Sequence, residues 1–182
     1  RLPPRSTPPV TLFPYTTLGR STVAENATTG SAVGITASAS DADATNNGIT
    51  YTLDDNAGGR FTINGTTGVV TVADGSLLDR ETAASHGIVV RATSADGSFT
   101  TQAFTINVSD VDEFDVGAVS DTNVGADTVA ENAGNGTTVG ITASASDADA
   151  TTNGITYTLD DNAGGRFTIN GATGVVTVAD GS

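Results

Sequence analysis

The sequence predicts an all-β protein made of Greek-key β-sandwiches, repeated in tandem about every 106 residues. Apolar and polar residues alternate with the two-residue period of β-strands. Turn signals such as Asn47-Gly48 and Asp96-Gly97 separate the alternating segments. Residues 23–76 return at positions 129–182 without a gap. A repeat of about one domain length indicates independent domains joined like beads on a string.

The two copies of the repeat are identical at 48 of 54 positions. The second copy stops at Ser182, where the first copy continues with residues 77–81. We therefore expect a fragment whose second repeat packs poorly and leaves strand edges unpaired. The predicted organisation is a segment over 1–22, a first repeat over 23–113, a junction over 114–128 and a truncated second repeat over 129–182.

Six segments of the first copy have strand character, and Val, Ile and Thr, which favour strands, fill them. In chain order they are 33–37, 49–53, 61–63, 70–72, 88–92 and 104–108. In the second of them, Ile49, Tyr51 and Leu53 share one face. Helix is nearly absent, apart from a possible turn over residues 79–84. This number of short strands in one repeat is typical of a β-sandwich.

Residues 1–22 differ from the rest of the chain. They contain all five prolines and none of the 21 acidic residues. The stretch from Leu12 to Ser21 resembles the translation of a sequencing adapter, with one mismatch at Gly19. We interpret residues 1–22 as non-native, and the alternative is a Pro-rich linker. Native DNA encoding them upstream of the repeats would contradict the first interpretation.

The composition excludes several classes of function. The formal net charge is −14, with seven arginines and no lysine, so the chain cannot neutralise nucleic-acid phosphates. Cysteine is absent, which removes disulfide frameworks and the usual zinc sites. No apolar run approaches the roughly 20 residues of a membrane span, and no signal-peptide pattern is visible.

Short acidic motifs lie in the loops and at the end of the predicted first repeat. In chain order they are Glu25-Asn26, Asp41-Ala42-Asp43, Asp79-Arg80-Glu81, Asp96 and Asp110-Val111-Asp112-Glu113. Clustered carboxylates repel one another unless a cation joins them. Calcium is a hard cation that takes six to eight oxygen ligands, largely from carboxylates and carbonyls. The motifs therefore indicate calcium binding, and solvated acidic loops are the alternative.

Other calcium signatures are missing. An EF-hand loop starting at Asp41 requires Asp or Asn at 45, Gly at 46 and Glu at 52, where this chain has Thr45, Asn46 and Thr52. The glycine-rich nonapeptide of parallel β-helices does not continue after Gly58-Gly59.

The order of the acidic motifs resembles a cadherin repeat, and is most similar to the cadherin-like domains of very large bacterial surface or secreted proteins. Residues 78–81, Leu-Asp-Arg-Glu, are the most specific part of the resemblance. It covers residues 23–113 and continues through 182. It implies an immunoglobulin-like sandwich with calcium held between successive repeats.

The resemblance also implies which residues bind calcium. At the junction of the two repeats they are Glu25, Asp79 and Glu81, then Asp110, Asp112 and Glu113, then Asp147 and Asp149, with a carbonyl ligand at Asn153. Asp41, Asp43 and Asp96 would serve an upstream junction, and Glu131 a downstream one. One departure is Phe114, which stands where vertebrate linkers carry a final Asn and offers only its carbonyl. Because Trp is absent, strand exchange through an N-terminal Trp has no support.

The function implied is a calcium-stiffened extracellular stalk for cell adhesion. Its expected partners are neighbouring repeats of the same chain and other cell-surface proteins or polysaccharides. We expect a bacterial surface or secreted protein whose membrane attachment lies elsewhere; the sequence does not decide whether adhesion is homophilic. The alternative is a carbohydrate-binding module, for which Phe99 is the candidate platform. We expect no enzyme, because cysteine is absent and His86, the single histidine, is expected to be structural.

Overall fold

The computed structural model describes residues 11–15, 21–42 and 47–181. The chain divides into two compact units, Arg1–Val111 and Asp112–Ser182, which are called unit 1 and unit 2 below. The predicted domain boundary after Glu113 lies just beyond this division. Each unit is described by itself.

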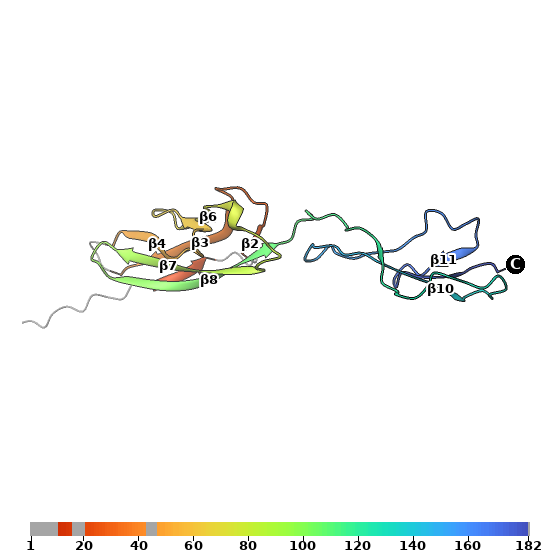
Figure 1. Cartoon of the computed structure of the whole chain (residues 1–182). Coiled ribbons are helices and arrows are strands. Elements are labelled where there is room, and N and C mark those ends of the chain that lie inside the picture. Colours follow the sequence, from red (N-terminus) through yellow and green to blue (C-terminus); the bar gives the residue numbers. More distant parts are fainter. Residues whose placement is uncertain (1–10, 16–20, 43–46, 182) are drawn as a thin grey trace, which may run out of the picture. The chain divides into compact units, whose positions relative to one another are not determined.

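Unit 1 consists of two sheets of four strands each (Figure 1). One sheet has the order β1-β3-β6-β5 and the other the order β2-β8-β7-β4. The strands are β1 (Thr11–Tyr15), β2 (Thr22–Ala24), β3 (Ala32–Ser40), β4 (Ile49–Asp55), β5 (Phe61–Ile63), β6 (Val69–Val72), β7 (Ser85–Ser94) and β8 (Phe99–Ser109). All six predicted segments are strands, so the all-β prediction is confirmed.

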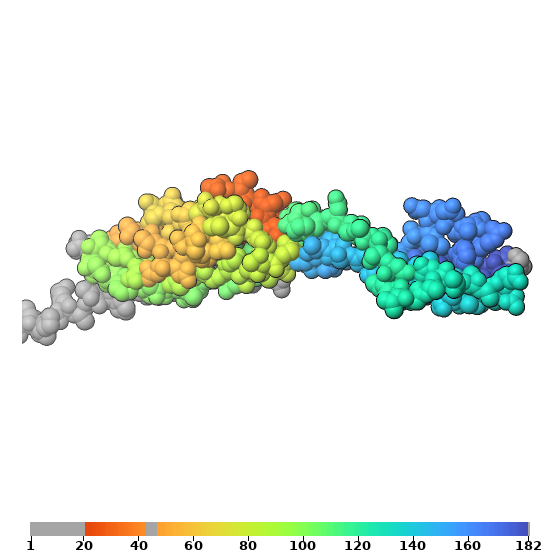
Figure 2. Space-filling model, viewed as in Figure 1, coloured from red at the N-terminus to blue at the C-terminus, as the bar shows by residue number. Residues whose placement is uncertain are grey.

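The core of unit 1 lies between these sheets. Side chains of β3, β5 and β6 meet those of β7 and β8, and the deeply buried ones include Val33, Ile35, Phe61, Val70, Ile88, Val90 and Ile106. These are the apolar positions of the alternating pattern, because every second side chain of a strand faces the same side of its sheet. On the face that Figure 2 shows, the atoms of unit 1, coloured orange to green, form a closed surface over the core.

Backbone geometry at one glycine fixes the pairing of β3 with β6. Gly68 has φ +71°, and a Cβ there would lie 2.2 Å from the carbonyl oxygen of Ala37. The backbone of Ala37 can approach so closely only because glycine has no side chain. The Ala37 amide then donates to the Gly68 carbonyl at 2.8 Å, which ties the turn to β3.

Two short elements precede β7. A 3₁₀-helix, η1 (Gly75–Leu77), begins after Asp74, whose side chain accepts from the Ser76 amide at 3.0 Å. A turn follows at residues 80–82, where the sequence predicted one. These elements carry the chain from β6 of one sheet to β7 of the other.

Two strands involve the segment 1–22, which was not expected to join the fold. Thr11–Tyr15 pairs antiparallel with β3, and Thr22 begins β2, which pairs parallel with β8. In unit 2, β9 (Ser120–Asp121) pairs with β10 at the corresponding edge. A strand at this edge is therefore part of the fold in both units. That residues 1–22 are non-native stays a prediction.

Unit 2 has one four-stranded sheet, in the order β11-β12-β10-β9. Its longer strands are β10 (Thr138–Ser144), β11 (Phe167–Ile169) and β12 (Val175–Val178). The buried part of its core is small, comprising Val139, Val176 and Val178. Among the described residues of unit 2, no second sheet faces this one.

Candidate metal centres

The first candidate centre is built around Glu25, at the end of β2. Its side chain is 5% exposed although it carries a carboxylate. One oxygen accepts from the Val111 amide at 2.6 Å, and the other accepts from the Arg80 amide at 2.6 Å. Hydrogen bonds to the charged form stabilise a buried carboxylate. Glu25 therefore links the segment after β8 to the Leu-Asp-Arg-Glu segment before β7.

Asp79 is held by its own turn. Its two oxygens accept from the amide and the hydroxyl of Thr82, at 2.8 and 2.7 Å. The bond from the Thr82 hydroxyl has the larger effect and the bond from its amide the smaller, and both lower the pKa of Asp79 below its ordinary value. The turn is closed by the Ala83 amide, which donates to the Asp79 carbonyl at 3.0 Å. Asp79 is thus kept ionised and fixed in place.

Ligand atoms of Glu25, Asp79 and Glu81 lie within 4.8 Å of one another. Glu25 is far in sequence from Asp79 and Glu81, which are two positions apart. The hydrogen bond that the Arg80 amide donates to the Glu25 side chain brings the three together. Three carboxylates at this spacing repel one another, and a cation between them removes that repulsion. All three supply hard oxygen donors, the type that calcium takes. The residues present therefore fit a calcium ion.

The second candidate centre lies in unit 2 around Asp149, which is 1% exposed. Its Oδ1 accepts from the amides of Glu113 and Phe114 at 3.2 and 3.3 Å. Its own amide donates to Asp147 Oδ1 at 3.2 Å. Its Oδ2 is buried and accepts no hydrogen bond from a donor among the described residues. A buried carboxylate oxygen without a donor is costly, and a bound cation would remove that cost.

Asp112 completes this group of acids. Its carboxyl lies close to that of Asp149. No hydrogen bond joins the two groups when both are ionised, and one can form only when one of them binds a proton. That hydrogen bond, then the negative charges of Asp149 and Asp147, raise the pKa of Asp112 above its ordinary value. A cation would favour the ionised form instead. The acids of unit 2 are therefore arranged like those of a cation site.

The remaining predicted ligands have varied surroundings. Asp110 is half-buried directly after β8, while Glu113, Glu131 and Asn153 are exposed. Asp41 is half-buried, and Asp96 is exposed and accepts from the amide and hydroxyl of Ser98 at 2.8 and 2.6 Å. Those bonds lower the pKa of Asp96. Asp43 lies outside the described residues.

One ion pair was missed by the sequence interpretation. Adjacent acids before Asn-Ala-Gly-Gly predict turn residues at both Asp54 and Asp55. Only Asp55 has that role, accepting from the Ala57 amide at 2.8 Å. Asp54 binds Arg91 through two hydrogen bonds of 2.7 and 2.6 Å. Position 54 pairs with a residue 37 positions away, so no local signal could have found it. The pairing of β4 with β7 places the two side by side.

Most aromatic side chains of the predicted strands are buried or half-buried. Tyr51 and Phe61 are buried, and Phe104 is half-buried. Phe99 is 56% exposed, and the Arg91 guanidinium lies over its ring at 4.0 Å from the centroid. His86 packs beside Phe61, with ring centroids 6.2 Å apart. Burial, and to a smaller extent the positive charge of Arg60, lowers the pKa of His86. The structural interpretation of His86 fits this packing.

The cadherin domain is the family whose model matches residues 20–109. Residues 20–109 are a cadherin domain. Human Protocadherin Fat 4 is 39% identical over 163 residues, and human Protocadherin Fat 1 is 37% identical over 141 residues. These matches cover 86% and 76% of this chain, and the chain spans only 3% of the length of either relative.

Solved structures agree with the cadherin assignment. Mouse Cadherin-23 EC22-24 is 28% identical with a TM-score of 0.67, covering 88% of this chain and 51% of that one. Protocadherin Gamma B2 extracellular domains 3-6 reach a TM-score of 0.75 at 20% identity, over 95% of this chain and 44% of that one, and show the fold alone.

The family sets the general character of the molecule. Cadherin domains are adhesion modules of extracellular or cell-surface proteins rather than enzymes, and they generally bind calcium. The relatives named are animal proteins, so the bacterial origin stays a prediction. In the described part of the chain, no helix has the length and apolar character needed to cross a membrane.

Proposed function

We propose that this chain is part of an extracellular cadherin stalk for cell adhesion, in which calcium bound between successive repeats stiffens the array. One observation carries the proposal. Buried Glu25 uses both oxygens to hold backbone amides, and its ligand atoms lie within 4.8 Å of those of Asp79 and Glu81. Burying the Glu25 carboxylate beside two other carboxylates costs free energy, and a bound cation would offset that cost.

The proposed ligands at the junction of the two repeats come from three places. They are Glu25, Asp79 and Glu81 of the first repeat, Asp110, Asp112 and Glu113 of the linker, and Asp147, Asp149 and the Asn153 carbonyl of the second. Asp149 Oδ2, buried without a donor, and the raised pKa of Asp112 support the part in unit 2. Asp41, Asp43 and Asp96 are proposed for an upstream junction, and Glu131 for a downstream one.

Calcium titration of the full chain tests the metal sites. Calorimetry should give a dissociation constant on the order of 0.1–1 mM, as in other extracellular modules. At about tenfold excess over that constant, the midpoint of thermal unfolding should rise by the equivalent of about 1.4 kcal/mol. Magnesium should give a smaller rise, because it prefers to keep its water ligands.

Matched variants assign the effect to the proposed ligands. Glu81→Gln and Asp149→Asn should each weaken calcium binding, since each removes one negative ligand. Asp54→Asn is the control, because Asp54 already binds Arg91 and is not a proposed ligand. The site is refuted if calcium leaves unfolding unchanged, or if Asp54→Asn weakens binding as much as the other two.

Small-angle X-ray scattering tests the stiffening separately from binding. When EDTA is replaced by calcium, the maximum dimension of the chain should increase. The range of dimensions that the chain adopts in solution should become narrower. Binding without this change would retain the metal sites and reject the stalk.

A carbohydrate-binding module is the second candidate, favoured by the exposure of Phe99. The ring has one face under the Arg91 guanidinium, which leaves the other for a sugar to stack on. Phe99→Ala should abolish retention on polysaccharide columns if this function is correct. Retention unchanged by Phe99→Ala would reject the platform.

A further inference from the structure

Asparagine followed by glycine occurs five times in this chain. The pairs are 47–48, 64–65, 135–136, 153–154 and 170–171. At such a pair the glycine nitrogen can attack the side-chain amide carbon of the asparagine, because glycine has no Cβ to block the approach. All five asparagines are exposed. Exposure therefore does not distinguish the pairs from one another, whereas their hydrogen bonds do.

Hydrogen bonds hold the asparagine in pairs 64–65 and 170–171. Asn64 Oδ1 accepts from the amides of Thr66 and Thr67 at 3.0 and 2.9 Å. The Gly68 amide also donates to the Asn64 carbonyl at 2.9 Å. The side chain and the carbonyl of Asn170 are held in the same way. Ring closure at either pair must turn both groups and break these bonds.

The pair 135–136 is held at both reacting groups. Asn135 Oδ1 accepts from the Gly181 amide at 3.0 Å. The Gly136 nitrogen, which would have to make the attack, donates to the Val178 carbonyl at 2.8 Å. This pair is therefore protected by different bonds from the first two.

The remaining two pairs are not held in this way. Within the part of the chain that the structure describes, the side chains of Asn47 and Asn153 take part in no hydrogen bond. The nitrogens of Gly48 and Gly154 donate none there either. Both reacting groups are thus free to approach each other.

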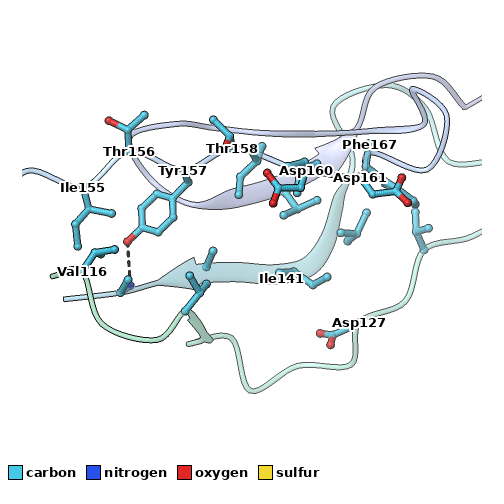
Figure 3. Close-up of a pocket in the computed structure, with 18 residues that line it drawn as sticks. Val116, Asp127, Ile141, Ile155, Thr156, Tyr157, Thr158, Asp160, Asp161 and Phe167 are labelled. Carbon is cyan, nitrogen blue, oxygen red and sulfur yellow. Dashed lines mark hydrogen bonds between the residues drawn. The ribbon is translucent and has the colours of Figure 1, made fainter. Parts of the chain in front are cut away.

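The segments that follow these two pairs are fixed. In unit 1 the next strand is β4, which pairs with β7, and the Tyr51 hydroxyl accepts from the Ala39 amide at 3.0 Å. In unit 2, residues 155–161 line one side of a cavity, and the Tyr157 hydroxyl accepts from the Ala145 amide at 3.1 Å (Figure 3). The freedom of the two asparagines is therefore local, and it is the same in both copies of the repeat.

We propose that Asn47 and Asn153 are sites of spontaneous deamidation in the folded chain, and that the other three Asn-Gly pairs are protected. The glycine nitrogen forms a bond to the asparagine Cγ and gives up its proton, and the bond from Cγ to the side-chain nitrogen breaks to release ammonia. Water then opens the succinimide at either carbonyl, which yields aspartate or isoaspartate. Each event adds a negative charge to a chain that is already acidic.

Incubation of the full chain at mildly alkaline pH in EDTA tests the proposal. Peptide mapping by mass spectrometry should show ammonia loss at Asn47 and Asn153 at least about tenfold faster than at Asn64, because Asn64 must first break its hydrogen bonds. In urea, where the chain is unfolded, all five pairs should react at similar rates. Equal rates in the folded chain, or faster reaction at Asn64, overturn the proposal.

Gly48→Ala and Gly154→Ala are matched variants. No atom would lie within 4 Å of the new Cβ at either position, and neither glycine has a positive φ, so both variants should fold as before. The added methyl group hinders the attack, so deamidation should fall at the altered pair and continue at the other. Thermal unfolding checks the fold of each variant. An unchanged rate at the altered pair also overturns the proposal.

Repeating the incubation in calcium separates this proposal from the proposed function, on which the expected calcium effect rests. If the Asn153 carbonyl binds calcium, its peptide unit is fixed, and ammonia loss at Asn153 should slow while that at Asn47 does not change. Fast loss at Asn153 in both calcium and EDTA supports deamidation and removes Asn153 from the proposed ligands.

Discussion

Residues 49–55 and 155–161 have the same sequence and different structures. The first segment is β4, paired with β7, and the second is not a strand. Residues 22–24 and 128–130 differ in the same way, since only the first is a strand. Both strands of unit 1 pair with β7 or β8, and the described residues of unit 2 contain no strand in the corresponding place. These segments therefore form strands only when a partner strand is present.

The sheet that contains β3 has the same strands in both units. β3, β5 and β6 correspond to β10, β11 and β12, and all six are strands. Their partners lie within the 54 residues that both copies contain. The same alternating sequence thus gives a sheet where its partners are local to the repeat. Strand propensity describes fit to a sheet more than an intrinsic preference of the backbone.

Ile88→Asp should have the largest effect, by making unit 1 resemble unit 2. The side chain is 0% exposed in the core, so an unpaired charge there should cost about 4 kcal/mol or more. Hydrogen exchange should show loss of protection over 22–24 and 49–55. Thr105→Asp, at an exposed position on β8, is the control. Protection that persists over 49–55 would contradict the dependence on partner strands.

Phe61→Ala and Phe167→Ala compare the two cores directly. Phe61 is 1% exposed, so its truncation should cost about 3–5 kcal/mol. Phe167 is half-buried and lines the cavity, so the same change should cost less in unit 2. Urea unfolding followed by the amide NMR signals of each unit measures both. Equal losses would mean that unit 2 is packed in solution as tightly as unit 1.

Gly68→Ala and Gly174→Ala should instead behave alike. A Cβ at Gly174 would lie 2.1 Å from the Ala143 carbonyl oxygen, as at Gly68. Both glycines have positive φ, so each alanine should cost about 1–3 kcal/mol in its own unit. Gly48→Ala is the control, since no atom would lie within 4 Å of the new Cβ. A loss in one unit alone would show that the two sheets differ in solution.

The smallest effects are those of pH in the absence of calcium, and they have opposite signs in the two units. The pKa of Asp79 is lowered from 3.8, so its stabilisation of unit 1 is present above that value and is lost as pH falls through the lowered pKa. The pKa of Asp112 is raised from 3.8 by Asp149, so unit 2 gains stability as pH falls through the raised pKa toward 3.8.

NMR titration of the carboxyl carbons measures both values. Thr82→Ala should raise the pKa of Asp79, because it removes the hydroxyl donor. Asp149→Asn should lower that of Asp112, because it removes the neighbouring charge. A pKa of Asp112 at or below 3.8 in the unchanged chain would contradict the crowding of acids in unit 2.

The sequence by itself determined which segments can be strands and where the turns lie. It also identified the acids of the candidate metal centres, because the Leu-Asp-Arg-Glu motif and the acids after residue 109 are local patterns. Alternation of apolar side chains reports the two faces of a strand, whether or not the strand is paired. For that reason six of the eight strands of unit 1 were predicted from the sequence, and β1 and β2 were not.

Only the tertiary structure decided which copies of a segment become strands and which acids meet. Glu25 reaches Arg80 and Val111 through backbone amides 55 and 86 positions away, and Asp54 meets Arg91 37 positions away. Hydrogen bonds of this kind depend on how distant segments are paired, which no local pattern specifies. Segment 155–161 has every residue that forms β4, and it lacks the strand that would complete its hydrogen bonds.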